Sequence, residues 1–142
     1  MKRYRFLEHV SDAYIAAYGT SLEEAFENAA LSMFSVMTDI KRIRKLVKEE
    51  VTVEAENEKT LLHDWLSKLH LKFETERILF SSFKVHTIDK TNTLFRLTGE
   101  AYGEPFDPKR HPSRAEVKAV TYHRMEVVES QGRWTIKFIL DL

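Results

Sequence analysis

The sequence predicts an α+β fold, in which two amphipathic helices pack on a mostly antiparallel β-sheet within a single compact domain. Two segments repeat apolar residues at steps of three and four, as helices with one buried face do. At least five other segments alternate apolar and polar residues, as half-buried strands do. The chain has 142 residues, the size of one ordinary domain, so we expect residues 1–142 to form one unit.

The two predicted helices span residues 21–38 and 58–74. Ser21 and Glu24 stand at capping-box spacing, so the serine hydroxyl can accept from the third helical amide while the glutamate reaches back to the cap. The apolar stripe of the first helix comprises Leu22, Ala25, Phe26, Ala29, Met33, Phe34 and Met37. The stripe of the second comprises Leu61, Leu62, Trp65, Leu66, Leu69 and Phe73. Both stripes are typical of helix faces that line a core.

The predicted strands follow segments with a period of two. The alternation is plainest in VTVEAE, FKVHTI, LFRLTGEAYG, AEVKAVTYHRMEVV and RWTIKFIL. Gly132 indicates a hairpin turn between the last two segments, and residues 89–93 indicate another between FKVHTI and LFRLTG. Short turns of this kind join antiparallel neighbours, and such strands need only one buried face.

Composition limits the function. The 22 Lys and Arg residues balance 22 Asp and Glu residues, so the molecule as a whole offers no general attraction to phosphate backbones or anionic lipid. Without cysteine there are no disulfides, thiolate metal sites or cysteine nucleophiles. No stretch approaches the roughly 20 apolar residues that cross a bilayer, and the start lacks an apolar signal core. We therefore expect a cytoplasmic protein without membrane contact.

Motifs of common enzymes are missing. The sequence has no GxxxxGK[ST], GxGxxG, HExxH or GxSxG pattern, so we do not expect a self-sufficient enzyme, although an autonomous metal-dependent hydrolase stays an alternative. Oxygen and imidazole groups instead gather in three places, which are His9 with Asp12, then Glu104 with Asp107 and His111, and finally Asp141 with Leu142.

The Asp141–Leu142 pair is chemically unusual. The side-chain carboxylate of Asp141 stands one residue from the main-chain carboxylate of Leu142. With a third carboxylate such as Asp12, these groups would suit Ca²⁺ or Mg²⁺, because both ions prefer oxygen ligands. The alternative is a solvated chain end, since nothing local brings Asp12 near it.

The histidines and the basic residues each allow two interpretations. His9, His111 and His123 could be ligands or general bases, or ordinary hydrogen-bonded histidines. A basic set could contact RNA or an acidic partner, or form a solvated face; it comprises Lys109, Arg110, Arg114, Lys118 and Arg124. The run KRIRKLVK at residues 41–48 is interpreted in the same two ways, with a helix exit as the simpler one.

Several segments, taken in order, resemble the archease family. FLEHVSDAYIAAYGTSLEEAFENAALSMFSVMTD resembles its amino-terminal signature, LLHDWLSKL its second helix, GEPFDPKRHPSRAEVKAVTYHRM its most distinctive block and WTIKFILDL its final strand. One departure is EHVSDAYI, where the family more commonly has EHTADVGI; the aspartate, Asp12, is kept.

The resemblance implies a function and a site. Archeases activate the ligase that joins tRNA exon halves, by promoting its guanylylation by GTP and its repeated turnover. The family's Ca²⁺-type site, which Mg²⁺ or Mn²⁺ could also fill, maps onto Asp12, Asp141 and Leu142. The family's lysine in the VKAVTYH block maps onto Lys118, which we expect to contact the ligase or its nucleotide. A chaperone-like action on a tRNA methyltransferase is the alternative, and direct contact with RNA is left open.

Overall fold

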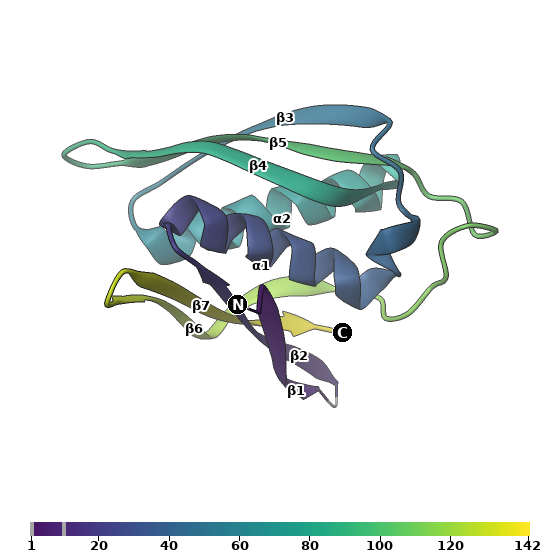
Figure 1. Cartoon of the computed structure of the whole chain (residues 1–142), viewed down its shortest axis with the longest axis horizontal. Coiled ribbons are helices and arrows are strands. Elements are labelled where there is room, and N and C mark those ends of the chain that lie inside the picture. Colours follow the sequence, from purple (N-terminus) through teal and green to yellow (C-terminus); the bar gives the residue numbers. More distant parts are fainter. Residues whose placement is uncertain (1, 10) are drawn as a thin grey trace.

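The computed structural model describes residues 2–9 and 11–142, and it shows an α+β domain. Its elements are β1 (Tyr4–His9), β2 (Asp12–Gly19), α1 (Leu22–Met37), a 3₁₀ turn (Ile40–Arg42), β3 (Val47–Ala55), α2 (Glu58–Glu76), β4 (Ile78–Lys90), β5 (Phe95–Pro105), β6 (Ala119–Ser130) and β7 (Arg133–Asp141). The predicted fold class is confirmed. The layering is more elaborate than expected, because the helices lie between two sheets instead of covering one face of a single sheet (Figure 1).

Both helices begin where the sequence predicted. The Ser21 hydroxyl accepts from the Glu24 amide at 3.0 Å, as predicted, but the Glu24 carboxylate accepts from the amide of Thr20, the residue before the cap, and not from that of Ser21. Asn57 caps α2 in the same way, by accepting from the Thr60 amide at 2.9 Å. These caps satisfy amides that have no partner inside the helix, which fixes the start of each helix.

The strands form two antiparallel sheets. We call the four-stranded sheet β1-β2-β7-β6 the terminal sheet, because it contains both ends of the chain, and the three-stranded sheet β3-β5-β4 the middle sheet. In the terminal sheet β2 and β7 are central neighbours, and their register runs from Asp12 opposite Asp141 to Gly19 opposite Trp134. The first and last parts of the sequence therefore lie side by side.

The core lies on both sides of the helical layer. Helix α1 contacts β4 of the middle sheet and β2 of the terminal sheet, and α2 contacts β3 and β6. Trp65 is fully buried between the layers, and its indole N–H donates to the Phe26 carbonyl at 3.0 Å. This bond ties α2 to α1 and satisfies the one polar atom of the largest core side chain. Among the described residues, neither helix has the length and apolar content to span a membrane.

Strand β6 begins later than its alternating pattern predicted. The segment before it binds the end of α1 and does not pair as a strand. The Arg114 and Ala115 amides donate to the carbonyls of Met37 and Val36, at 3.0 and 3.1 Å. These two bonds satisfy carbonyls at the end of α1, which lack partners inside the helix. The strand is then interrupted between Thr121 and Glu126 by a bulge that contains Arg124 at φ 55°. The strict alternation expected there therefore does not hold.

The β6–β7 turn offers a test of the fold. Gln131 and Gly132 both have positive φ, 53° and 77°, which is the backbone of a type I′ turn. Glutamine is strained there, whereas asparagine tolerates it, so Gln131→Asn should raise the free energy of unfolding by about 0.5–1 kcal/mol. Urea denaturation measures the change. An unchanged or lower stability would contradict the assigned turn, and Ser130→Asn, one residue earlier in the strand, is the control.

Candidate functional site

The structure brings Asp12, Asp141 and Leu142 to one corner, at the end of the terminal sheet. Asp12 is the first residue of β2 and stands directly opposite Asp141, the last residue of β7. The Leu142 amide donates to the Ser11 carbonyl at 3.1 Å, and the half-buried Leu142 side chain packs against the core. The backbone that carries all three groups is thus fixed by the sheet.

The two aspartates share one face of the sheet. The Leu142–Ser11 bond makes that pair a hydrogen-bonded one, so the adjacent Asp12–Asp141 pair is of the non-hydrogen-bonded kind, in which side chains approach most closely. Their neighbours Ala13 and Leu140 are buried in the core, so both carboxylates lie on the outer face, and both are exposed. Like charges directly opposite each other are unfavourable, and a cation between them removes the repulsion.

Lys118 lies at the same corner. Its amide donates to the Asp141 carbonyl at 2.8 Å, and its side chain is exposed while that of Val117 is buried. The Val117 carbonyl accepts from Nε2 of His70 at 2.7 Å, which anchors this segment to α2. The lysine that resemblance singled out is therefore a neighbour of the residues expected to bind metal.

The donor chemistry of the corner fits a hard cation. Carboxylate oxygens are the ligands that Ca²⁺, Mg²⁺ and Mn²⁺ prefer. The third donor expected from the sequence is the main-chain carboxylate of Leu142, which is not a side chain. Indeed, within residues 2–9 and 11–142 no three His, Cys, Asp or Glu side chains gather as a metal cluster. Water would have to supply the other ligands, since calcium takes six to eight oxygens.

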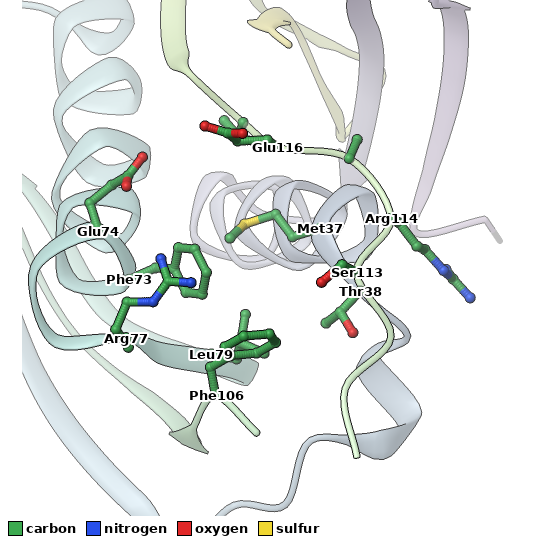
Figure 2. A pocket seen from close by; sticks show the side chains of 12 residues that line it. Met37, Thr38, Phe73, Glu74, Arg77, Leu79, Phe106, Ser113, Arg114 and Glu116 are labelled. Carbon is green, nitrogen blue, oxygen red and sulfur yellow. The ribbon is translucent and has the colours of Figure 1, made fainter. Parts of the chain in front are cut away.

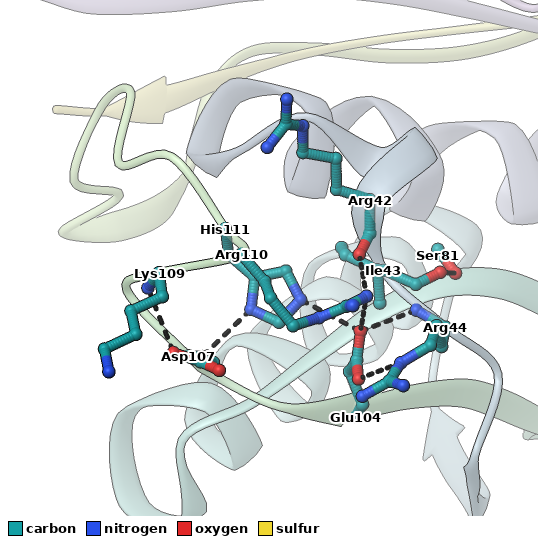
Figure 3. Close-up of polar contacts among 9 residues, drawn as sticks. All are labelled: Arg42, Ile43, Arg44, Ser81, Glu104, Asp107, Lys109, Arg110 and His111. Carbon is teal, nitrogen blue, oxygen red and sulfur yellow. Dashed lines mark hydrogen bonds and ion pairs between the residues drawn. The ribbon is translucent and has the colours of Figure 1, made fainter.

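The second constellation, Glu104 with Asp107 and His111, has a structural role (Figure 3). Glu104 is 2% exposed and His111 is 1% exposed, and the Glu104 carboxylate accepts from Nε2 of His111 at 3.0 Å. The same carboxylate accepts from the Arg44 amide at 2.7 Å and from the Arg44 guanidinium at 3.0 Å. Arg110 approaches it at 3.3 Å. A single buried anion thus binds donors from two segments, one before β3 and one after β5.

Hydrogen bonding assigns the tautomer of His111. The Asp107 amide can only donate, and it lies 2.9 Å from Nδ1, so Nδ1 carries a lone pair and Nε2 carries the proton that Glu104 accepts. Burial by itself raises the pKa of Glu104. The hydrogen bonds from Arg44 and His111, together with the charge of Arg110, outweigh burial and hold that pKa at about 2, below the ordinary 4.5. The Glu104 carboxylate and the His111 ring therefore form hydrogen bonds that hold the loop after β5 in place.

The remaining sequence candidates differ in their surroundings. The side chain of His9 lies outside the described part of the chain, and that of His123 is exposed. Of the basic set, Arg110 is bound to Glu104 and to the Arg42 carbonyl at 3.0 Å, whereas Lys109 and Arg114 are exposed. Arg110 is thus engaged within the protein, whereas the side chains of the other four basic residues are exposed.

A cavity that the sequence did not reveal lies where both helices end (Figure 2). It has a volume of about 390 Å³ and is bounded by the ends of α1 and α2 and by residues 113–117. The Arg77 guanidinium packs over the rings of Phe73 and Phe106, at 4.3 and 5.4 Å from their centroids. Thr38 lines the cavity, and its hydroxyl is buried with no hydrogen-bond partner among the described residues. Glu74 and Glu116 also line it, so its charges are mixed.

Known proteins share this arrangement. Residues 4–142 match the sequence profile of the Archease protein family. The chain belongs to the archease family. It is 42% identical over 142 residues to the protein archease of Sulfolobus acidocaldarius, with 100% of both chains covered. It is 45% identical over 142 residues to that of Methanothermobacter thermautotrophicus, again with 100% of both covered. Family membership therefore rests on the whole length of the chain.

Two solved structures have the same fold. The solution structure of Methanobacterium thermoautotrophicum protein 1598 superposes with a TM-score of 0.88, at 45% identity and with 100% of both chains covered. The crystal structure of a Thermotoga maritima archease, described as a possible chaperone, gives a TM-score of 0.60 at 17% identity, covering 97% of this chain and 96% of that one. The second likeness shows the fold alone.

The Glu104 cluster predicts how stability of this archease depends on pH. Because the folded-state pKa is depressed, the carboxylate stabilises the protein above pH 4.5, and this contribution is lost as the pH falls from about 4.5 to about 2. Glu104→Gln should lower the free energy of unfolding by about 3 kcal/mol at pH 7. The difference from wild type should shrink through that acid window. Urea unfolding at several pH values measures both, and a pH-independent difference would contradict the assignment.

The cavity offers a separate test at Thr38. Valine has nearly the same shape and lacks the buried, unpartnered hydroxyl, while the Thr38 amide keeps its bond to the Phe34 carbonyl. Thr38→Val should therefore raise the free energy of unfolding by about 1 kcal/mol. Thr60→Val, at a partly exposed position in the first turn of α2, is the control. Destabilisation by Thr38→Val, measured by urea unfolding, would show that the hydroxyl has a partner in the cavity.

Proposed function

We propose that this protein activates a tRNA-splicing RNA ligase and is not itself the catalyst, and that it does so through a Ca²⁺-type site at the corner of Asp12, Asp141 and Leu142. The observation that supports the proposal is the convergence of these three groups, with Lys118 beside them, at one exposed end of the terminal sheet. Family membership supports the ligase as the partner.

The chemistry of the corner suggests how activation works. A bound cation neutralises charge on phosphate oxygens, and such neutralisation is a general means of assisting phosphoryl transfer. Asp12 and Asp141 would hold the cation on the outer face, while the sheet keeps the backbone of Leu142 in place. Lys118 adds a flexible positive charge next to the same corner, suited to contacting the ligase or its nucleotide.

The metal site is tested by calorimetric titration with Ca²⁺. Asp12→Asn and Asp141→Asn should each abolish binding, because each removes one anionic ligand of a small set. Folding should change little, since both side chains are exposed. Asp89→Asn, an exposed aspartate at the end of β4, should bind Ca²⁺ as the parent does. Parent-like binding by both corner variants would show that the site is elsewhere or absent.

Activation is tested by multiple-turnover tRNA ligation. The protein should stimulate the ligase at substoichiometric amounts, and Lys118→Glu should impair stimulation while leaving Ca²⁺ binding in place. Lys84→Glu, an exposed lysine of β4 in the middle sheet, is the charge-matched control. Undiminished stimulation by Lys118→Glu and by both aspartate variants would refute the assigned corner.

A chaperone-like action on a tRNA methyltransferase is the second candidate. It is supported by the Thermotoga maritima relative, which is described as a possible chaperone. A chaperone that shields its client from aggregation is needed in rough proportion to that client, whereas an activator is not. Dependence on the ratio of the two proteins therefore distinguishes the candidates, and proportional demand would favour the chaperone.

A further inference from the structure

The outer faces of the two sheets differ in how many of their charged side chains form ion pairs. On the middle sheet, three basic side chains have acidic partners, because Lys48 and His86 contact Glu100 at 3.3 and 2.6 Å and Arg96 contacts Glu54 at 3.8 Å. On the terminal sheet, no ion pair within 4 Å forms among the side chains that the structure describes. The charges of the middle sheet are thus partly paired, although Lys84 and Lys90 form no ion pair within 4 Å, whereas the described side chains of the terminal sheet form none.

These basic groups form a row along β2. The Arg124 guanidinium lies over the Tyr14 ring at 4.4 Å, and the Arg133 guanidinium lies over the Tyr18 ring at the same distance. Lys137 stands opposite Ala16, between the two stacks and on the same face. The row spans about 13 Å, since four residues of a strand rise about 3.3 Å each. We call Arg124, Lys137 and Arg133 the cationic row.

The side chains beneath the cationic row are mainly apolar and are buried. Tyr14 and Ile139 are each 7% exposed and Ala16 is 1% exposed, although no helix packs on this face. A cation stacked on an aromatic ring is held in place, yet the N–H edges of its guanidinium remain available for hydrogen bonds. Glu126 stands opposite Lys137 in the register and forms no ion pair with it within 4 Å. The row therefore presents ordered donors at intervals.

Backbone strain at Arg124 also indicates that this face is a binding surface. An arginine at φ 55° lies in a region that favours glycine, so the bulge stores strain that Gly would relieve. The Arg124 guanidinium at this strained position is stacked on Tyr14, and Arg124 is exposed. Strained non-glycine residues concentrate at binding sites, where the surrounding structure holds them.

We propose that the outer face of the terminal sheet binds single-stranded nucleic acid, with the cationic row contacting successive phosphates. Phosphates are repeated anions along a chain, which matches repeated cations along a strand, and guanidinium forks bind phosphate in a bidentate way. Guanidinium planes also offer stacking surfaces to unpaired bases. The zero net charge of the whole chain is compatible with this, because the attraction is confined to one face. The proposal goes beyond ligase activation and needs no ligase.

The test measures fluorescence anisotropy of a labelled oligouridylate, about a dozen nucleotides long, in low salt with a chelator present. The full chain should bind it, and the logarithm of affinity should fall with the logarithm of salt at a slope of about −2, as expected for three phosphate contacts. Arg133→Ala and Lys137→Ala should each weaken binding several-fold and flatten the slope by about 0.7. An oligothymidylate arm tells whether the sugar matters, and binding of either strand supports the proposal.

Matched variants separate the cationic row from general charge loss. Arg124→Gly should also weaken binding, while the fold is kept because glycine accepts φ 55° without strain. Arg96→Ala and Lys84→Ala remove cations from the middle sheet and should leave binding unchanged. The proposal is overturned by absence of binding in low salt, by equal losses in both variant sets, by preference for a duplex, or by tighter binding of polyglutamate than of either oligonucleotide.

Discussion

Strands β2 and β7 lie in the centre of the terminal sheet, and their register decides where both ends of the chain lie. Ile15 stands opposite Phe138, and both are fully buried against the helices. A slip of one residue would turn these side chains to the outer face, so burial of the core selects the register. That register also places Asp12 opposite Asp141. The candidate metal corner is thus a geometric consequence of core packing.

The same sheet explains what could be predicted from the sequence. The helices were predictable because capping and apolar spacing are local, as the Ser21 and Asn57 caps illustrate. Strand β2 escaped the period-two pattern, because residues 13–17 are all buried and one face of the strand is as apolar as the other. The division into two sheets was not predictable either, since alternation shows that a strand has one buried face and not which sheet it joins.

The candidate site, too, could be predicted from the sequence only in part. Spacing could not bring Asp12 to Asp141, because their meeting depends on strand pairing between opposite ends of the chain; only resemblance to a family indicated it. Glu104 and His111 are a contrasting case. The sequence allowed His111 to be a ligand, a general base or an ordinary hydrogen-bonded histidine, and its burial within a closed set of hydrogen bonds with Glu104 supports the last of these. A sequence shows which groups could do chemistry, whereas exposure and partners decide which are free to do so.

That buried cluster nevertheless serves the corner. Glu104 and His111 hold the loop after β5, and the Arg114 and Ala115 amides then bind the end of α1. His70 fixes the Val117 carbonyl just before Lys118. The chain between β5 and β6 has little regular structure, yet hydrogen bonds attach it to the rest of the domain at each of these points. These attachments fix the position of the Lys118 backbone at the corner. Buried polar groups can therefore position an exposed residue that we propose contacts the partner.

The corner and the cationic row share one face, and this makes their proposed ligands interdependent. Without a cation, Asp12, Asp141 and the Leu142 carboxylate repel a polyanion that approaches along Arg124 and Lys137. A bound Ca²⁺ would remove that repulsion and would make the end of the face a further phosphate contact. Coupling of this kind is reciprocal, so a strand lying on the row would raise the affinity of the corner for its cation by the same factor. A face that carries both charges in separate zones can thus link metal binding to nucleic-acid binding without any change in backbone conformation.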